Sequence, residues 1–356
     1  MRDGSEVSLS TAPAAIGRFG FCVGLFYISW RERNAASRKP LFGRREELMR
    51  HADLAMYRAK ALGRDGIVRY HRGLLHAVEE RTTFEEELRT AIAEGQFAVD
   101  YQPQVDLADG RISGLEALVR WDHPTRGRLA PDEFLGVAVE SALIVALDTW
   151  VLARACSDVR DWRQAGVAVP RLGVNIAADN LRDPRFVDAL REIVARTSLP
   201  AGAIELEVAE ALPLDDDGPG RSALERLRAD GITLAVDDFG SRRADLGSLR
   251  AAPVDVVKVD RRYVAEIDRP DPDGPPASLL AEGPLLVDGI VALAGALGLR
   301  TVAIGVETQA QRSYLARIGC DAVQGWLYAH PLDADLVVRV LRHSEVAPPP
   351  TARRAD

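Results

Sequence analysis

A series of polar side chains, most of them able to bind a divalent cation, interrupts short apolar stretches that have the composition of buried strands. They are Gln102, Glu116, Asn175, Glu207, Asp237, Asp238, Lys258 and Gln324. A charge inside a buried strand costs several kcal/mol unless it is paired or bound to metal. One such residue is easily accidental. A series of them, one or two in each stretch, predicts side chains that converge from strand ends on a single site.

The elements that must position these residues alternate between strand-like and helix-like patterns beyond Gly95. Helices are expected at residues 131–142 and 145–165, and a final helix at 334–343. Repeated β-α units over roughly 250 residues are typical of a parallel barrel, which places functional residues at the C-terminal ends of its strands. The sequence therefore predicts an α/β fold, a TIM-like (β/α)8 barrel over residues 83–343.

The segment before the barrel, residues 1–80, has the pattern of a small, truncated α+β unit, with a helix expected at 44–62 and a strand at 67–70. A capping box from Thr83 to Glu86 is expected to open a further helix, which ends at Gly95 and joins the two modules. Residues 268–283, rich in Pro, Gly and Asp, are interpreted as an inserted surface loop, and residues 344–356 as a disordered tail.

Composition narrows the classes of function. A formal net charge of −8 over 356 residues argues against a protein that binds polymeric nucleic acid, which needs a basic surface. The apolar run at 19–30 would make a helix of roughly 18 Å, too short for a hydrocarbon core of about 30 Å, so a membrane span is not expected. The widely spaced Cys22, Cys156 and Cys320 suggest neither a disulfide framework nor a zinc site, which fits a cytoplasmic location.

Several motifs, taken together, carry a resemblance to a known family. They are Tyr101-Gln102-Pro103, Glu116 to Trp121, Asp237-Asp238-Phe239-Gly240, Lys258-Val259-Asp260, Gly305-Val306-Glu307-Thr308, and Gly319 to Asp321 with Gln324-Gly325. In this order and with this spacing, over about residues 83–343, they resemble the EAL family of cyclic di-GMP phosphodiesterases. Residues 52–64 resemble the C-terminal end of a GGDEF diguanylate cyclase domain, but the sequence lacks the cyclase signature, so no cyclase activity is expected.

The resemblance implies hydrolysis of one phosphodiester of cyclic di-GMP in a TIM-like barrel that uses Mg²⁺ or Mn²⁺. It implies that Glu116, Asn175, Glu207 and Asp237 hold the first metal, and that Asp237 with Asp238 reaches the second. It further implies that Lys258 holds the nucleophilic water or a phosphate, that Gln102 and Arg120 contact substrate, and that Glu210 and Gln324 complete the catalytic apparatus. Independently of the family, so many hard oxygen ligands suit Mg²⁺ or Mn²⁺ better than zinc.

The chain departs from the family pattern at two places. Ile304 stands where the family has a glutamate with a catalytic role, as general base or second-metal ligand. The loss of a positioned base typically costs about 10² to 10⁴ in rate. The loop after the two aspartates carries Arg242 and Arg243 where the family tends to have a glycine and small hydroxyl residues. Both changes are expected to impair hydrolysis rather than folding.

Each site residue also has a purely structural interpretation. Lys258 could form an ion pair with Asp260 or Asp255, Glu207 could share a solvated strand face with Glu205, and Asp237 with Asp238 could cap a turn.

Three hypotheses describe the function of the chain. The first is a module that binds cyclic di-GMP and a divalent metal with impaired hydrolysis, the second an active phosphodiesterase that yields linear pGpG, and the third a non-functional remnant. A protein partner or a homodimer is left open.

Overall fold

The computed structural model describes residues 72–209, 218–240, 246–268 and 282–344. The chain divides into two compact units, Met1–Glu87 and Leu88–Asp356, and the boundary falls within helix α2 (Arg72–Glu94). The predictions for residues 1–71, for most of the inserted loop and for the tail from residue 345 lie outside the described residues.

Helix α2 corrects one expectation. It is continuous from Arg72, so the Thr83 to Glu86 capping box lies inside the helix instead of opening it. The reason is that residues 74–82 contain neither glycine nor proline, and nothing in them ends a helix before Thr83. Near the C-terminal end of α2, Leu88 and Ala91 are fully buried.

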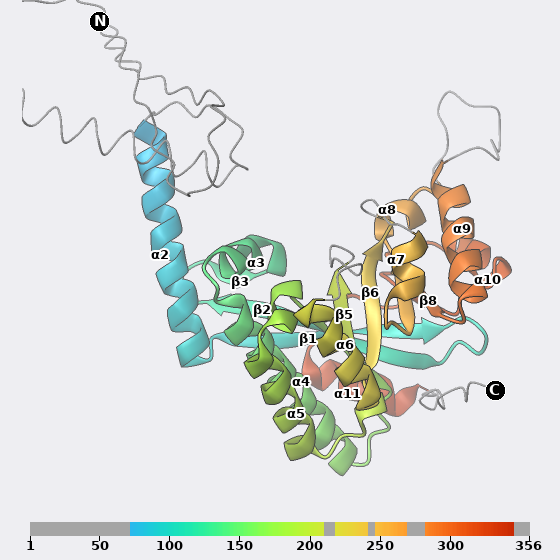
Figure 1. Cartoon of the computed structure of the whole chain (residues 1–356), viewed down its shortest axis with the longest axis horizontal. Helices are drawn as coiled ribbons and strands as arrows, with labels where there is room; N and C mark the ends of the chain where they lie inside the picture. Colours follow the sequence, from blue (N-terminus) through green and yellow to red (C-terminus); the bar gives the residue numbers. More distant parts are fainter. Residues whose placement is uncertain (1–71, 210–217, 241–245, 269–281, 345–356) are drawn as a thin grey trace, which may run out of the picture. The chain divides into compact units, whose positions relative to one another are not determined.

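The strands form a closed barrel, which confirms the predicted TIM-like α/β fold (Figure 1). The sheet has nine strands in the order β1-β9-β8-β7-β6-β5-β4-β2-β3, and it closes because β1 also pairs with β2, which leaves β3 outside the ring. The strands are β1 (Phe97–Asp106), β2 (Ile112–His123), β3 (Gly127–Leu129), β4 (Arg171–Ile176), β5 (Ile204–Ala209), β6 (Thr233–Phe239), β7 (Val256–Val259), β8 (Arg300–Ile304) and β9 (Ala322–Gln324).

The barrel is not wholly parallel, which corrects a second expectation. Strand β1 runs antiparallel to both of its neighbours, β2 and β9, whereas β2 and β4 to β9 pair in parallel. Only a short turn separates β1 from β2, and a connection of that length joins antiparallel strands, because parallel strands need a crossover of a dozen or more residues.

The helices lie outside the strands (Figure 1). They are α3 (Pro131–Glu140), α4 (Ile144–Gln164), α5 (Pro184–Thr197), α6 (Pro219–Ala229), α7 (Leu246–Ala251), α8 (Arg261–Val264), α9 (Glu282–Ala296), α10 (Gln309–Arg317) and α11 (Ala334–His343), with short 3-10 turns at Ala178–Arg182 and Ala201–Ala203. The expected helices at 131–142, 145–165 and 334–343 therefore exist, with ends shifted by at most two residues. No helix in the described residues is long and apolar enough to cross a membrane.

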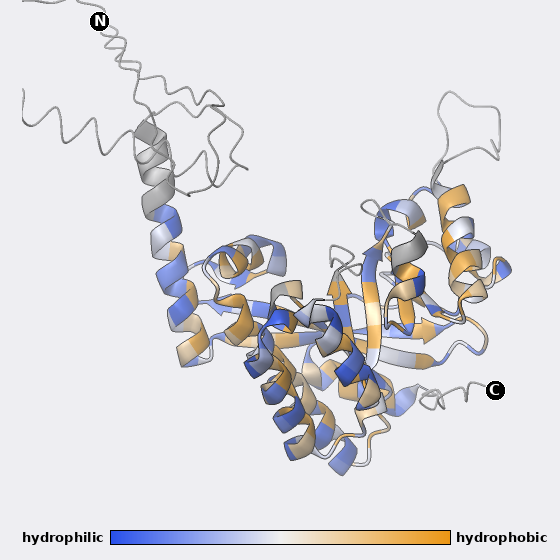
Figure 2. Cartoon of the chain, viewed as in Figure 1, coloured by the Kyte–Doolittle hydropathy of each residue, from blue (hydrophilic) through white to orange (hydrophobic). Residues whose placement is uncertain are grey.

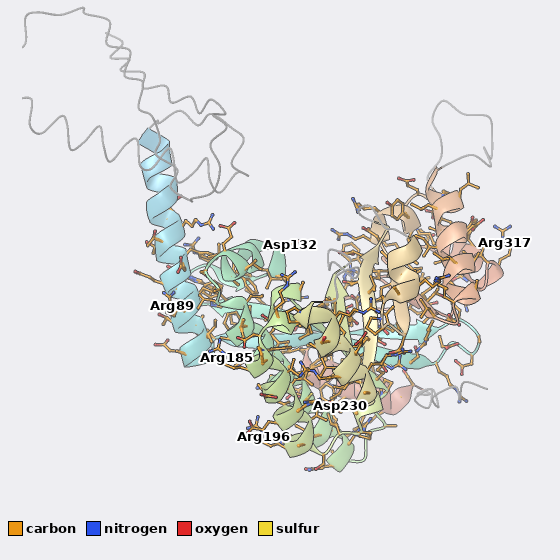
Figure 3. All side chains as sticks on the ribbon, viewed as in Figure 1. Arg89, Asp132, Arg185, Arg196, Asp230 and Arg317 are labelled. Atoms are coloured by element: carbon orange, nitrogen blue, oxygen red, sulfur yellow. The ribbon has the colours of Figure 1, made fainter. Side chains whose placement is uncertain are left out.

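The distribution of hydrophobic residues on the helices explains why they pack against the barrel. Helices such as α4 and α5 carry hydrophobic and hydrophilic residues side by side, as expected for helices with one buried stripe (Figure 2). The charged side chains labelled on the outer helices, such as Arg185, Arg196 and Asp230, are exposed (Figure 3). The apolar stripes of these helices therefore face the barrel.

One layer of the barrel interior lies directly below the site. It is a buried cluster of Ala235, Val256, Val302 and Ala322, contributed by β6, β7, β8 and β9. Side chains two residues apart on a strand point to the same face. The next residues on that face are therefore Asp237, Lys258, Ile304 and Gln324. Small and branched apolar residues fill the lower layer, and the layer above it holds the polar side chains predicted from the sequence.

Candidate active site

The centre of the candidate site is the ammonium group of Lys258, a side chain with 0% exposure. Lys258 Nζ lies 3.0 Å from Glu116 Oε2 and 3.8 Å from Asp237 Oδ1, and it also donates a short hydrogen bond to Glu207 Oε2. These residues come from β7, β2, β6 and β5. The convergence predicted from the sequence is thus present for all four.

The structural interpretations of Lys258 and Glu207 are wrong. Asp260 accepts hydrogen bonds from Arg262, and Asp255 pairs with Arg228, so neither is the partner of Lys258. Glu205 and Glu207 are both buried, and Glu205 forms an ion pair with Arg171 at 2.8 Å. The two glutamates therefore do not form a solvated strand face.

Amide side chains complete the cluster around Glu116. Asn175 Nδ2 donates to Glu116 Oε1 at 2.7 Å, and Gln324 Nε2 donates to Glu116 Oε2 at 2.6 Å. Gln324 also donates to Gln102 Oε1 at 3.0 Å, and Gln102 Nε2 donates to the carbonyl of Ala329. Both oxygens of Glu116 are therefore held by side chains from β4 and β9, and Gln102 links the cluster to the turn after β9.

Burial and charge set different pKa values for the acidic residues. Burial opposes ionisation of Glu116, but the Lys258 charge and the hydrogen bonds from Gln324, Lys258 and Asn175 outweigh it and lower the pKa of Glu116. Burial, together with the charge of Glu116, raises the pKa of Glu207 well above its usual value. Burial likewise raises the pKa of Asp237 to about 6. Three acidic groups facing one ammonium group leave an excess of negative charge when all are ionised, which a divalent cation would balance.

The donor atoms of this cluster fit a hard divalent metal. Glu207 Oε1 and Asp237 Oδ1 are buried and have no hydrogen-bond partner among the described residues. Buried carboxylate oxygens without partners are costly unless a cation binds them. In the described part of the chain no three Asp, Glu, His or Cys side chains are arranged to hold a metal ion. Glu116 and Glu207 both contact the Lys258 ammonium group. The chemistry of the donors nevertheless suits Mg²⁺ or Mn²⁺.

A glycine that sequence reasoning missed makes room for this arrangement. A side chain at Gly173 of β4 would collide with Glu207 Oε1. Glycine in a strand interior weakens the strand and often marks the close approach of another group, and this was the signal available in the sequence. Gly173 therefore lets the Glu207 carboxylate approach the backbone of β4 closely.

Asp238 and Arg120 lie apart from the Lys258 contacts. Asp238 has a φ of 53°, in the left-handed region, and the pairing of β6 with β7 shifts register between Val236 and Phe239. This irregularity leaves Asp238 exposed beside the half-buried Asp237. Arg120 follows Glu116 on β2, and its Nε lies 2.9 Å from Asp100 Oδ2. Glu210, Arg242 and Arg243 lie outside the described residues.

Ile304 lies in the ring of site residues. It is the last residue of β8, is half-buried, and pairs in register with Gln324 of β9. It lies two residues beyond Val302, which is part of the interior cluster, so its side chain is on the face that carries the site. Glu307 is exposed, in the connection between β8 and α10, as its distance from the strand end predicts. An apolar side chain thus stands between Lys258 of β7 and Gln324 of β9.

Comparison with known proteins gives a consistent result. Residues 85–331 match the EAL domain family. The chain is 40% identical over 306 residues to the "Cyclic di-GMP phosphodiesterase NbdA" of Pseudomonas aeruginosa, covering 85% of this chain and 38% of that protein. It is 36% identical over 291 residues to the "Bifunctional diguanylate cyclase/cyclic di-GMP phosphodiesterase MucR" of the same organism, covering 82% of this chain and 41% of that protein. The chain thus spans about two fifths of the length of these relatives.

Solved structures show the same relationship. A structure of the PaMucR phosphodiesterase in complex with c-di-GMP superposes with a TM-score of 0.65 at 34% identity, covering 72% of this chain and 99% of that one. The EAL domain of Mycobacterium smegmatis DcpA superposes with a TM-score of 0.56 at 29% identity, covering 71% of this chain and 99% of that one.

Proposed function

Because the chain belongs to the EAL domain family, we propose that it binds cyclic di-GMP and a divalent metal, Mg²⁺ or Mn²⁺, and that its hydrolysis of the dinucleotide is impaired. One observation supports both halves of this proposal. The ring of Glu116, Glu207, Asp237 and Lys258 is assembled at the end of the barrel strands, whereas Ile304 places an apolar side chain in the same layer.

The residues of this chain have separate tasks in the proposed site. Glu116, Asn175, Glu207 and Asp237 would hold the metal, and Asp238 would reach a second one. When bound, such a cation polarises a phosphoryl oxygen and favours formation of a nucleophile from water. Lys258, which contacts three acidic groups, would orient a water molecule or a phosphate oxygen. Gln324 and Asn175 fix the two oxygens of Glu116, so its carboxylate cannot turn away.

In this proposal, Ile304 is the reason why hydrolysis is impaired although cyclic di-GMP still binds. An isoleucine can neither accept a proton nor coordinate a second cation, and Glu307 is exposed beyond the strand end. The proposed roles of Glu210 as an anchor of the following loop, and of Gln102 and Arg120 as contacts for substrate, belong to the same proposal. The same proposal includes the origin of residues 1–80 from a GGDEF domain and a cytoplasmic location of the protein.

The second candidate is an active phosphodiesterase that yields linear pGpG. It is favoured by the relative named as a cyclic di-GMP phosphodiesterase, at 40% identity. A water chain or Glu307 would then have to replace the missing carboxylate.

One experiment separates these functions. The full chain is incubated with cyclic di-GMP and Mn²⁺; binding is measured by calorimetry, and linear product by chromatography of the same sample. Binding with little or no product is expected, and the variant Glu116→Gln should lose metal-dependent binding. Fast formation of pGpG would establish the second candidate. If neither binding nor product is found, both candidates fail and the hypothesis of a non-functional remnant stands.

A further inference from the structure

Asp100 is a buried acidic residue whose side-chain contacts lie outside the cluster around Lys258. It is 7% exposed and lies on β1, which pairs with β2. In that pairing Gln102 lies opposite Glu116, Asp100 opposite Leu118, and Ala98 opposite Arg120. Because Asp100 is two residues from Gln102, both side chains are on the same face of the ribbon, the face of the candidate site. Asp100 thus lies between the metal cluster and Arg120.

The two oxygens of Asp100 bind two different arginines. Asp100 Oδ2 lies 2.9 Å from Nε of Arg120, and Oδ1 accepts a hydrogen bond of 2.9 Å from Nη2 of Arg128 on β3. Arg120 also donates from Nη1 to the carbonyl of Val119 at 2.8 Å. The Arg120 side chain is 15% exposed, against 45% for Arg128, so Arg120 is the more enclosed partner. A guanidinium group held at Nε and at Nη1 has its plane fixed before any ligand arrives.

We propose that Asp100 is a positioning residue, which holds the Arg120 guanidinium in place to receive an anionic phosphate group of the dinucleotide. This inference rests on the proposed function, because it takes cyclic di-GMP as the ligand. Arginine recognises phosphate through a planar pair of N–H donors, so its orientation matters as well as its charge. Arg128 contacts only the other oxygen of Asp100, Oδ1, so the contact between Asp100 Oδ2 and Arg120 does not depend on it.

The sign of the effect distinguishes positioning from simple electrostatics. A carboxylate near a bound phosphate repels it, so removal of the charge alone would strengthen binding. Removal of a positioning residue instead leaves Arg120 to be ordered by the ligand. Immobilising one long side chain on binding weakens affinity by about 2- to 12-fold. Asp100→Asn is therefore expected to weaken binding if Asp100 acts through Arg120, and to strengthen it if Asp100 acts only through its charge.

The test is a double-mutant cycle on the full chain, with the Kd for cyclic di-GMP measured by calorimetry in the presence of Mn²⁺. Asp100→Asn should raise the Kd about 2- to 12-fold in the parent background and leave it unchanged in an Arg120→Ala background. Asp100→Glu, which keeps the charge, should recover part of the lost affinity. Arg128→Gln is the matched control, because it breaks the second contact of Asp100 but leaves the first, and it should stay within about twofold of the parent.

The remaining outcomes are decisive. Tighter binding by Asp100→Asn, an unchanged Kd, or the same loss in the Arg120→Ala background would overturn the inference. If Asp100→Asn does not fold, Arg120→Lys decides, because it keeps the charge but loses the planar group that Asp100 orients. Affinity equal to that of the parent would then refute the positioning role. If the parent itself does not bind cyclic di-GMP, the proposed function fails and this inference fails with it.

Discussion

The substitution Ile304→Glu tests most directly why hydrolysis should be weak in this chain. Ile304 ends β8, pairs with Gln324, and faces the layer that contains Lys258 and Asp237. A glutamate there would bring a carboxylate to the part of the ring where an oxygen donor is missing. We expect a gain of about 10- to 100-fold in the rate of pGpG formation with Mn²⁺, at or below the low end of the effect of a positioned base. The gain should be partial, because Arg242 and Arg243 still replace the small residues of the neighbouring loop.

The same substitution should make the metal-free protein less stable. The ring already holds Glu116, Glu207 and Asp237 against a single lysine. One more carboxylate about 7 Å from a like charge adds about 2 kcal/mol of repulsion at an effective dielectric constant of about 20. We therefore expect Ile304→Glu to melt at a lower temperature than the parent without metal, and to gain more from added Mn²⁺, because the cation relieves the repulsion.

The assay measures linear product by chromatography at saturating cyclic di-GMP, together with melting curves with and without Mn²⁺. Ile304→Gln is the matched control: it has nearly the same shape as glutamate but cannot act as a base or carry charge, so it should recover little activity and show no extra stabilisation by Mn²⁺. A glutamate variant that binds cyclic di-GMP, gains stability from Mn²⁺ and still hydrolyses no faster than the parent would refute the role given to Ile304. The arginine-containing loop would then be the cause.

Other predictions concern stability and metal binding. Burial raises the pKa of Asp148 to about 7, so the folded state binds a proton that the unfolded state has released above about pH 4, and stability should fall as pH rises from about 4 to 7. Asp148→Asn should remove that part of the pH dependence and stabilise the protein at pH 8 by roughly 1 to 4 kcal/mol. Urea unfolding of parent and variant at pH 5 and 8 measures the free energy of unfolding, and an equal pH dependence in the two proteins would contradict this prediction. Gly173→Ala should weaken Mn²⁺ binding at least about tenfold, because the new methyl group displaces Glu207, and unchanged calorimetry would show that the glycine is not needed. Lys258→Met should destabilise the metal-free protein by about 3 to 5 kcal/mol, with part of the loss recovered in Mn²⁺; a melting temperature equal to that of the parent would refute the buried ion pairs.

Local patterns were sufficient to predict most of the fold. The helix at 334–343 has the predicted ends because an aspartate cap precedes it and its apolar period is regular. The antiparallel direction of β1 was missed, although Asp109-Gly110 between two apolar runs was a turn signal that joins only antiparallel strands. The start of α2 was missed because a capping box was given more weight than the absence of any residue that ends a helix before it.

The candidate site was predictable as a set of residues but not as a set of contacts. Lys258 has nearby acidic residues in sequence at Asp255 and Asp260, yet it binds Glu116 and Glu207, which are far away in the chain. Closure of the barrel brings these strands together, and sequence spacing does not tell which of the converging side chains form contacts. The contact between Asp100 and Arg120 is hidden for the same reason, because it depends on the register of an antiparallel pair that was not expected.

The geometry also gives a reason why binding can persist after hydrolysis is impaired. The carboxylates of Glu116 and Glu207 are compensated by Lys258, Gln324 and Asn175, so the ring does not depend on a further glutamate for its structure. An isoleucine at position 304 continues the apolar layer formed below it by Ala235, Val256, Val302 and Ala322. Replacement of the glutamate therefore costs the folded state little. On the proposed function, such a change removes a group needed for chemistry but preserves the groups that hold the metal and the dinucleotide, which is the pattern expected of a catalytic barrel that becomes a receptor.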